Sequence, residues 1–504
     1  MSTELLSDLL DATADARPDA PAVDDGTTCR TYREVRDASV RLARRLGAEG
    51  VRRGDRVLVA LPTDAALPAL LYAVARAGAV FVVVRTPAPD VALAHVLDDA
   101  EPAVVLTDDA ALGDLARARH LPVRGAADLA RAAATGDGDV RAGGDAPAGA
   151  GPLAVDPVCL IYTSGSTGMP KAVVSTHAQV TFAVRAIQSE LRYRPDDVVH
   201  DVLPTSFDYG LYQIFLSTVA GARLRLGDPA ETGGRLLVGL VESGATVLPC
   251  VPSLAINLMR LLGRPGAPRP ALRLVTNTGA AMPPEVLAGL RRLLPGLSVQ
   301  LMFGLTECKR AAIMPPDEDL RRPGACGRAL PGTEIFTVDA DGRRQPAGVT
   351  GELVVRGPHV MAGYWRRPEL TAERFRRAHG LFPQLHTGDH GLVDADGYVH
   401  FAGRRDDVYK EKGTRVSATE VEAAAYRVDG VDAAGVLPPV DGHDGATLFV
   451  VAALTPGDVL RRLRGQLEEM KVPARCVVLP DLPLTGNGKV DRRALARLAG
   501  ERRG

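Results

Sequence analysis

Two hydrophobic patterns alternate along the first four hundred residues, and the alternation predicts a mixed α/β fold. Short, β-branched apolar runs that are typical of buried strands cover residues 56–61, 80–84, 103–107 and 273–276. Helix-like runs separate them. Strands that alternate with helices favour parallel sheets covered by helices. We therefore expect a large, multi-subdomain N-terminal α/β domain with mixed sheets flanked by helices.

The most apolar stretch, residues 67–84, is interrupted by Arg76 and Gly78 and changes from a helix-like half to a β-branched half. We expect a buried helix and then a buried strand, not a membrane span. The first twenty residues are acidic and lack an apolar core, so they do not resemble a signal peptide. The sequence therefore predicts a soluble, cytoplasmic protein.

Two changes in composition indicate the organisation of the chain. Residues 126–151 are rich in Ala, Gly and Asp, which is typical of a surface loop. From Gly397 the chain becomes dense in charge, and a short αβ pattern follows to the end. We place a boundary here, which gives an N-terminal domain over residues 1–403 and a small, mobile α+β domain over residues 404–504.

Composition argues against several classes of function. The formal net charge is −1, so the chain has no overall charge that would favour nucleic acid or an anionic membrane as a partner. The six cysteines form neither a CxxC pair nor a Cys/His cluster. We expect free thiols, with neither a zinc site nor a disulfide framework.

The stretch YTSGSTGMPK, residues 162–171, has the composition of an anion-binding turn. Small residues let backbone N–H groups point inward, and the hydroxyls and Lys171 add donors. The GxxxxGK[ST] consensus is not met, because Pro170 stands at its second glycine and a strand-like run follows. We expect this loop to bind nucleotide phosphates through Thr163, Ser164, Gly165, Ser166, Thr167, Gly168 and Lys171.

Further segments in the same chain order carry a family resemblance. They are TYREV (31–35), GDRVLVALP (54–62), GELVVRGPHVMAGYWRRPELTAERF (351–375), residues 386–422, and PLTGNGKVDRRAL (483–495). With the phosphate loop, they resemble the adenylate-forming superfamily of acyl-CoA synthetases, nonribosomal peptide adenylation domains and firefly-type luciferases. The resemblance implies a two-step reaction. A carboxylate attacks the α-phosphate of ATP to give acyl-AMP and pyrophosphate, and a thiol or another nucleophile then takes the acyl group.

The resemblance also implies roles for single residues in the first step. Lys489, in a glycine-flanked turn, would bridge the attacking carboxylate and the α-phosphate. Glu307 would bind Mg²⁺ and Thr306 would contact the α-phosphate, so the expected cofactors are ATP and Mg²⁺. Phe303 would stack on adenine, and Asp389 would accept the ribose hydroxyls. The implied nucleoside contacts are Gly279, Ala280, Phe303, Asp389 and Arg404.

For the second step, the resemblance implies a rotation of the small domain about Asp406. The rotation would bring a loop with Lys410 and Gly413 to the site, and Gly413 would leave room for a pantetheine arm. Retention of this loop favours a thiol as the acceptor.

Phe207 and Asp208 fall where the acid pocket of the family begins. Asp208 would pair with a substrate ammonium, as in amino-acid-activating members, but fatty- and aryl-acid relatives also carry Phe-Asp. Lys309 and Arg310 fit either a second substrate carboxylate or structural ion pairs on the outside of their loop. The residues expected to contact the acid are Phe207, Asp208, Tyr212, Asn277, Gly304 and Lys309.

Together these observations predict an AMP-forming acid–thiol ligase. It would activate an amino or β-amino acid and load the phosphopantetheine of a carrier protein, supplied in trans, in secondary metabolism. The alternative is a CoA ligase that uses free CoA and a non-amino acid. An amide-forming ligase and a non-catalytic nucleotide-binding protein are further alternatives. No nucleic acid or membrane partner is expected.

Overall fold

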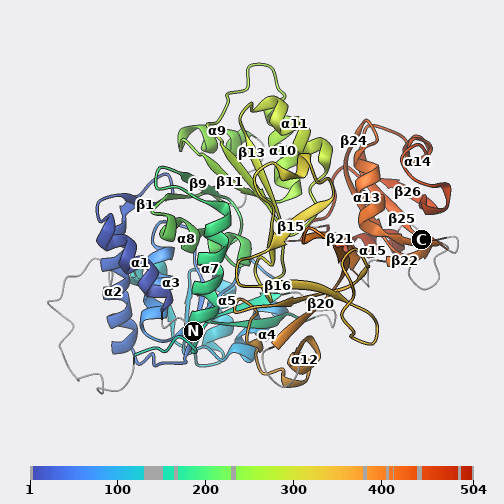
Figure 1. Ribbon diagram of the computed structural model, residues 1–504. Coiled ribbons are helices and arrows are strands. Elements are labelled where there is room, and N and C mark those ends of the chain that lie inside the picture. The colour runs from blue at the N-terminus through green and yellow to red at the C-terminus, as the bar shows by residue number, and fades with distance from the viewer. Residues whose placement is uncertain are drawn as a thin grey trace.

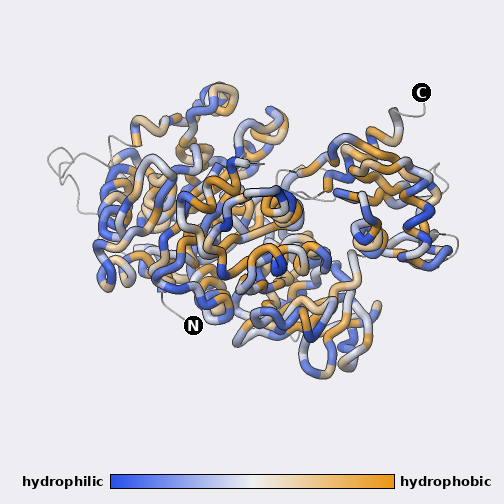
Figure 2. The backbone as a smooth tube through the Cα atoms, turned by 90° about the horizontal axis from the view of Figure 1, so that it is seen from above, coloured by the Kyte–Doolittle hydropathy of each residue, from blue (hydrophilic) through white to orange (hydrophobic). Residues whose placement is uncertain are grey.

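The computed structural model describes residues 4–129, 151–163, 169–228, 234–377, 383–404, 408–411, 414–439, 445–485 and 490–501. A large N-terminal part, blue to yellow in Figure 1, lies beside a smaller orange-red lobe formed by the C-terminal residues. Figure 2 shows the same two lobes from above. This is the α/β architecture, with a smaller C-terminal domain, that the sequence predicts.

One sheet contains the strands on both sides of the phosphate loop. Its order is β18 (Gly363–Tyr364), β8 (Lys171–Thr176), β7 (Pro157–Thr163), β4 (Val80–Val83), β3 (Arg56–Ala60), β5 (Val104–Thr107) and β6 (Val123–Arg124). The strands from β7 to β6 run parallel to one another. β8 is antiparallel to β7, and β18 pairs antiparallel with β8. The linking helices include α3 (Leu67–Arg76), α4 (Asp90–Ala100) and α5 (Ala110–Arg117). The predicted strands at 56–61, 80–84 and 103–107 and the helix–strand pair at 67–84 are confirmed.

A second sheet changes from parallel to antiparallel pairing part-way across. Its parallel half is β1 (Pro21–Asp24), β10 (Arg223–Leu226), β9 (Val198–Asp201), β11 (Val247–Cys250), β12 (Leu274–Asn277) and β13 (Ser298–Phe303), with β2 (Cys29–Thr31) antiparallel at its edge. Its antiparallel half is β14 (Ala312–Ile313), β15 (Ala325–Ala329), β21 (Tyr398–Arg404), β20 (Pro383–Val393), β17 (Gly351–Arg356) and β16 (Glu334–Val338), and β19 (Phe375–Arg377) pairs with β20. The residues that join β13 to β14 leave the sheet where the pairing changes, a place where open α/β sheets often bind ligands.

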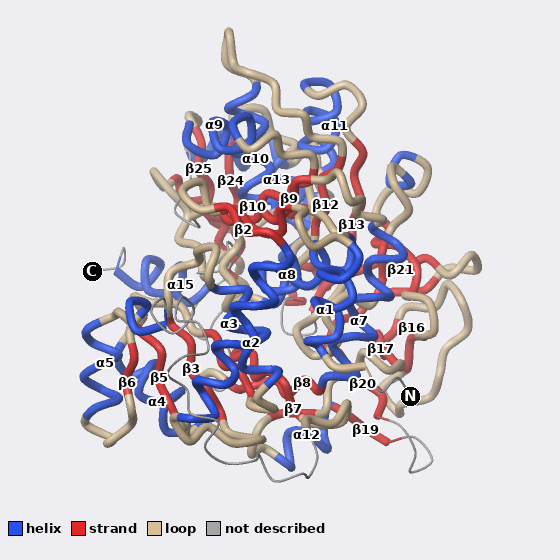
Figure 3. The backbone as a smooth tube through the Cα atoms, turned by 90° about the vertical axis from the view of Figure 1, so that its left-hand side faces the viewer, coloured by secondary structure: helices blue, strands red, loops and turns tan. Residues whose placement is uncertain are grey.

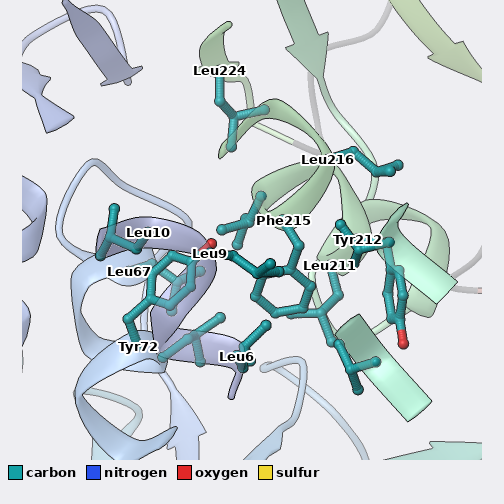
Figure 4. Close-up of a cluster of buried hydrophobic side chains, with 14 of the residues drawn as sticks. Leu6, Leu9, Leu10, Leu67, Tyr72, Leu211, Tyr212, Phe215, Leu216 and Leu224 are labelled. Carbon is teal, nitrogen blue, oxygen red and sulfur yellow. The ribbon is translucent and has the colours of Figure 1, made fainter. Parts of the chain in front are cut away.

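Helices bury the parallel strands. The helices of this part are α1 (Leu6–Ala16), α2 (Tyr32–Ala48), α7 (His177–Leu191), α8 (Asp208–Ala220), α9 (Gly234–Glu242), α10 (Pro252–Leu262), α11 (Pro284–Leu293), α12 (Pro368–Arg374) and the 3₁₀ turn η1 (Glu318–Leu320). Figure 3 shows α1, α2, α3, α7 and α8 grouped together over the sheets. Leucines of α1 pack against Tyr72 and Phe215 in the largest buried apolar cluster, and Tyr212 lies at its edge with its hydroxyl pointing away from α1 (Figure 4).

The C-terminal lobe has its own core. It contains β22 (Val408–Glu411), β23 (Thr414–Ser417), α13 (Ala418–Tyr426), β24 (Val431–Leu437), β25 (Thr447–Ala452), α14 (Pro456–Leu463), η4 (Glu469–Lys471), β26 (Arg475–Val478) and α15 (Arg492–Glu501). Apolar residues of α13, β24 and β25 form a separate buried cluster. Since β21 ends at Arg404 within the large sheet and β22 begins at Val408, the division after residue 403 stays a prediction.

Three other expectations can be compared with the structure. Across the described ranges, no helix combines the length and apolar character needed to cross a membrane. The six cysteines are all free thiols, as expected. Residues 126–129 are helical, and residues 130–150 lie outside the described residues, so the expected surface loop is not tested there.

Candidate active site

The candidate site is built on the connection between β13 and β14, residues 304–311, which we call the 304–311 loop. The loop is tightly folded: the backbone N–H of Ala311 donates to the carbonyl of Phe303 at 2.8 Å. A Cβ on Gly304 would stand 1.9 Å from the carbonyl oxygen of Lys309, so only glycine fits there. Lys309 itself has a φ of +59°, which is uncommon for a residue with a side chain. The fold of this loop brings Thr306, Lys309 and Arg310 close to the start of α8.

Three charged side chains are buried together at this point. Asp208 is the first residue of α8, where the helix dipole favours a carboxylate. Its Oδ1 accepts a hydrogen bond from Thr306 Oγ1 at 3.2 Å, and its Oδ2 lies 3.6 Å from Arg310 Nη1. Lys309 is 1% exposed and Arg310 is fully buried. The burial excludes the alternative in which Lys309 and Arg310 form ion pairs on the outside of the loop.

Aromatic rings surround the two buried cations. The guanidinium carbon of Arg310 lies 4.6 Å from the ring centroid of Tyr209 and 5.8 Å from that of Tyr212. Arg310 Nη2 donates to the carbonyl of Tyr209 at 3.4 Å, whereas Nε and Nη1 have no hydrogen-bond acceptor among the described residues. Lys309 Nζ donates to the carbonyl of Thr306 at 3.0 Å and lies 5.4 Å from the ring centroid of Tyr212. These N–H groups of Arg310 are therefore available to a water molecule or to an acceptor on a ligand.

Charge around the cluster is unbalanced. Burial lowers the pKa of Lys309, and the carboxylate of Asp208 opposes this shift. Burial raises the pKa of Asp201, at the end of β9, well above its usual range, which favours its neutral acid form beside Arg310. Two buried basic side chains, Lys309 and Arg310, thus lie near the carboxylate of Asp208, and Glu307 is a further acidic neighbour of Lys309.

Glu307 and Lys171 form a second polar group at the edge of the phosphate loop. Tyr364 Oη donates to Glu307 Oε1 at 2.7 Å, and Lys171 Nζ lies 4.0 Å from the same oxygen. The ammonium of Lys171 stands 3.9 Å from the centroid of the Tyr364 ring. Burial and the neighbouring carboxylate of Glu307 raise the pKa of Tyr364, so its hydroxyl remains a donor at neutral pH.

The described ends of the phosphate loop are held by the sheet. Thr163 ends β7 and is paired with Lys171, which begins β8, and Thr163 Oγ1 donates to the carbonyl of Lys171 at 3.4 Å. His95 Nε2 of α4 is 2.8 Å from the carbonyl oxygen of Pro170. A strand, not a helix, follows the loop, as the sequence predicts. Residues 164–168 lie outside the described residues, so the expected phosphate contacts of Ser164, Gly165, Ser166, Thr167 and Gly168 stay predictions.

The residues expected at the nucleoside lie on the antiparallel half of the large sheet and near its centre. Phe303 is buried at the end of β13, with its ring centroid 6.0 Å from that of Phe401. Asp389 is buried on β20, directly opposite the backbone of Arg404 on β21. Gly279, with a φ of +91°, and Ala280 follow β12. These positions leave the nucleoside roles as predictions.

The structure describes only some of the other residues that the sequence places at the site. Asn277 is buried and donates to the carbonyl of Cys250 at 3.1 Å, which ties β12 to β11. The ring of Phe207, just before α8, stands edge-on to that of Tyr209 with a centroid separation of 6.3 Å. Lys410 lies on β22, described only in its backbone. The remaining expectations, on Asp406, Gly413 and Lys489, fall outside the described residues.

Two tyrosines that contact the charged side chains of the site were not expected from the sequence. Tyr209 contacts Arg310, and its hydroxyl shares a hydrogen bond of 2.7 Å with Thr276 Oγ1, in which either oxygen can be the donor. Tyr364 contacts Glu307. For Tyr209, the one sequence signal of a role in the site was its position next to Asp208 at the start of a helix. Tyr364 lies in GYW, which is also a normal packing motif, so the sequence alone could not separate the two roles.

Comparison with known proteins now decides the family. The sequence profile of the AMP-binding enzyme family matches residues 10–365, and the profile of its C-terminal domain matches residues 420–489. The chain belongs to the AMP-binding enzyme family. It is therefore an adenylate-forming ligase of the AMP-forming type, and ATP-bound structures occur among its solved relatives.

Relatives in this family differ in length and in their named activities. The chain is 33% identical over 502 residues to a probable non-canonical nonribosomal peptide synthetase, CymA, from Salinispora arenicola, but it spans 6% of that protein. Three curated relatives, CymA among them, are much longer than this chain, which covers 6%, 37% and 6% of their lengths. A feruloyl-CoA synthase from Amycolatopsis sp is 31% identical, with 96% of each chain covered.

A solved relative is closer in sequence. VinN is 40% identical, with 80% of this chain and all of VinN covered, and superimposes with a TM-score of 0.72. A structure of VinN with L-aspartate has also been solved, with 39% identity and a TM-score of 0.71.

Proposed function

We propose that this adenylate-forming ligase activates an amino dicarboxylic acid, an α- or β-amino acid such as aspartate, as its acyl-AMP. The observation that carries the proposal is the buried cluster in which Asp208 faces Lys309 and Arg310. With Lys309 protonated and Glu307 reserved for Mg²⁺, the cluster has one positive charge that a zwitterionic monocarboxylic amino acid does not balance. An amino dicarboxylate, with a net charge of −1, balances it.

The cluster also offers a partner for each charged group of such a substrate. The ammonium would pair with Asp208, which the sequence proposed for that role. One carboxylate would accept from the N–H groups of Arg310 that have no acceptor among the described residues, and from Lys309. The other carboxylate would be left to attack ATP. The L-aspartate complex of VinN, a relative with 39% identity, supports this substrate class.

We propose Glu307 as the magnesium ligand. No group of three or more His, Cys, Asp and Glu side chains that could hold a metal occurs within the described ranges. That finding fits Mg²⁺, which is commonly held by one or two carboxylates together with phosphate oxygens and water. Magnesium would neutralise charge on the phosphates. Lys171 would hold the outgoing pyrophosphate, and Lys489 would bridge the carboxylate and the α-phosphate.

For the second step we propose transfer to the phosphopantetheine thiol of a carrier protein in secondary metabolism. The relationship to a nonribosomal peptide synthetase supports a carrier thiol. The relationship to a feruloyl-CoA synthase supports free CoA as the second candidate acceptor. Both acceptors present the same pantetheine thiol, so the two candidates differ in what carries it.

Mass spectrometry of the products tests the proposal. The purified full-length protein is incubated with ATP, Mg²⁺ and aspartate, then with either CoA or a phosphopantetheinylated carrier. We expect aspartyl-AMP in the first incubation and a thioester on the carrier in the second. Formation of acyl-AMP only from monocarboxylic acids would contradict the substrate class. Aspartyl-CoA without a carrier thioester would replace the carrier with CoA.

A further inference from the structure

Helix α4 contacts the phosphate loop, residues 162–171, near both of its ends. His95 Nε2 is 2.8 Å from the carbonyl oxygen of Pro170, close to the end of the loop. Asp99 Oδ2 accepts a hydrogen bond of 2.8 Å from Tyr162 Oη, at its start. His95 and Asp99 are four residues apart in α4, so they lie on the same face of the helix. One face of one helix thus contacts the chain on both sides of the loop.

The apolar side of α4 fixes the helix against the strands that flank the loop. Apolar side chains of α4 belong to one buried cluster with Leu160 of β7 and Ala172 of β8. The ring of Tyr162 packs against the same cluster. Because buried side chains are close-packed, the helix gives the polar groups of His95 and Asp99 a defined place relative to both strands.

The contact of His95 acts on the peptide group that precedes Lys171. Pro170 has no N–H to donate to a sheet, and the described pairs of β7 and β8 end at Thr163 and Lys171. Since a carbonyl oxygen can only accept, the ring nitrogen of His95 is the donor. The peptide group is planar, so a bond that holds the carbonyl of Pro170 also fixes the direction in which the backbone of Lys171 begins.

The contact of Asp99 is supported by a third segment. Asp99 is buried, and its Oδ1 accepts from Arg367 Nη2 at 2.8 Å, which leaves Oδ2 to Tyr162. Trp365 Nε1 donates to the backbone carbonyl of Asp99 at 3.1 Å. Burial and the carboxylate of Asp99 raise the pKa of Tyr162, so its hydroxyl remains a donor at neutral pH.

We propose that His95 and Asp99 are positioning residues that hold the two ends of the phosphate loop in the geometry that binds ATP. His95 acts on Lys171 through the carbonyl of Pro170, and Asp99 acts through Tyr162. The inference rests on the proposed role of this loop and of Lys171 in holding the pyrophosphate part of ATP. It adds two residues of a neighbouring helix, neither of which needs to contact the nucleotide.

Calorimetric titration of the full-length protein with ATP and Mg²⁺ and, separately, with AMP tests the inference. His95→Ala removes the donor to Pro170, and Tyr162→Phe removes the donor to Asp99 without disturbing the bonds from Arg367 and Trp365. Each variant should bind ATP about fivefold more weakly, the effect of one lost hydrogen bond. The affinity for AMP, which lacks the pyrophosphate part, should stay within about twofold of the wild type. A purely structural role would weaken both nucleotides alike.

Two matched variants complete the experiment. His95→Gln supplies an amide N–H for the carbonyl of Pro170, so its ATP affinity should return to within about twofold of the wild type. Asp98 also lies on α4, but its carboxylate pairs with Arg119 and is 62% exposed. Asp98→Asn should therefore bind ATP like the wild type.

The outcomes separate this inference from the proposed function. Wild-type ATP affinity in His95→Ala or Tyr162→Phe, or an equal loss with AMP, would overturn the positioning role. A wild type that binds ATP no better than AMP would overturn the role of the loop and the inference with it. The titrations contain no acid, so none of these results depends on the acid that the enzyme activates.

Discussion

At the level of single residues, the proposed preference for a second carboxylate depends on Arg310. It is fully buried, lies over Tyr209 and retains N–H groups without an acceptor among the described residues. The carboxylate of Asp208 at 3.6 Å offsets part of the cost of burying this cation, and a ligand anion that accepts from the remaining N–H groups would offset more. We therefore expect Arg310 to contribute more to selectivity than to folding.

Substitution of Arg310 by Met should remove the preference for a second carboxylate. Truncation of one partner of a buried charge pair costs about 2–5 kcal/mol, so kcat/KM for aspartate should fall at least about thirtyfold. Activity with a monocarboxylic amino acid should fall less, because the surplus charge is gone. Pyrophosphate exchange with both acids measures the ratio.

Arg273→Met is a suitable control for this experiment. Arg273 is partly buried and pairs with Asp197, and it lies just before β12, away from the cluster. This variant should lose stability and keep the wild-type ratio. An unchanged ratio in Arg310→Met would show that Arg310 does not read the second carboxylate.

At the scale of elements, the 304–311 loop depends on a close backbone approach. A Cβ on Gly304 would meet the carbonyl oxygen of Lys309 at 1.9 Å, and a backbone atom can yield only if the loop moves. Gly304→Ala should therefore lower stability by about 1–3 kcal/mol and reduce adenylation more than tenfold. Thermal unfolding and pyrophosphate exchange measure the two effects.

The chain offers a control of opposite sign. Gly47 lies in α2, and a Cβ there would have no heavy atom within 4 Å. Gly47→Ala should raise stability by about 0.5–1 kcal/mol and leave adenylation unchanged, because alanine favours a helix more than glycine does. If Gly304→Ala behaved like Gly47→Ala, the tight loop would not be required.

The contact between α1 and α7 should depend on pH. His177 Nδ1 accepts the backbone N–H of Leu6 at 3.1 Å, and burial lowers the pKa of His177 to about 4, from about 6.5. The folded protein thus favours the neutral ring. The contribution of the neutral His177 ring to the free energy of unfolding is fully present above about pH 6.5 and is lost as the pH falls towards 4. Between pH 7 and 5 the loss should be about 2 kcal/mol.

Urea unfolding of the wild type and of His177→Asn at pH 7 and pH 5 tests this contact. The amide oxygen of Asn can accept the same N–H but does not titrate. The variant should therefore lose about 2 kcal/mol less than the wild type over this interval. Equal losses would show that His177 does not titrate as its environment implies. His359, whose pKa burial also lowers to about 4, is present in both proteins and cancels.

In the whole molecule, an ion pair and an aromatic side chain connect the two lobes. Arg260 of α10 and Asp432 of β24 form an ion pair of 2.8 Å, with side chains 46% and 52% exposed. Exposed pairs of this kind contribute at most about 1 kcal/mol. Tyr426 of α13 also packs against the buried apolar cluster of α10 and α11, so the mobility of the C-terminal domain stays a prediction.

The sequence predicts several strands of the first sheet and β12 of the second, because β-branched runs such as residues 56–61 and 80–84 are buried on both faces and leave little ambiguity. It also placed Asp208, Thr306 and Lys309 at one site, although they are about a hundred residues apart, through motif order. It could not decide between two roles for Arg310, because burial depends on the fold of the 304–311 loop. Nor could it find the contact of Tyr364 with Glu307, which requires β18 to pair with β8.

We propose above all that the buried cluster of Asp208, Lys309 and Arg310 selects an amino dicarboxylic acid. ATP–pyrophosphate exchange by the wild type, with aspartate, succinate, alanine, β-alanine, an aryl acid and a fatty acid, tests it most directly. We expect exchange with aspartate at least about tenfold above that with succinate, which lacks the ammonium, and with alanine and β-alanine, which lack the second carboxylate. Equal or better exchange with a monocarboxylic or non-amino acid would contradict it.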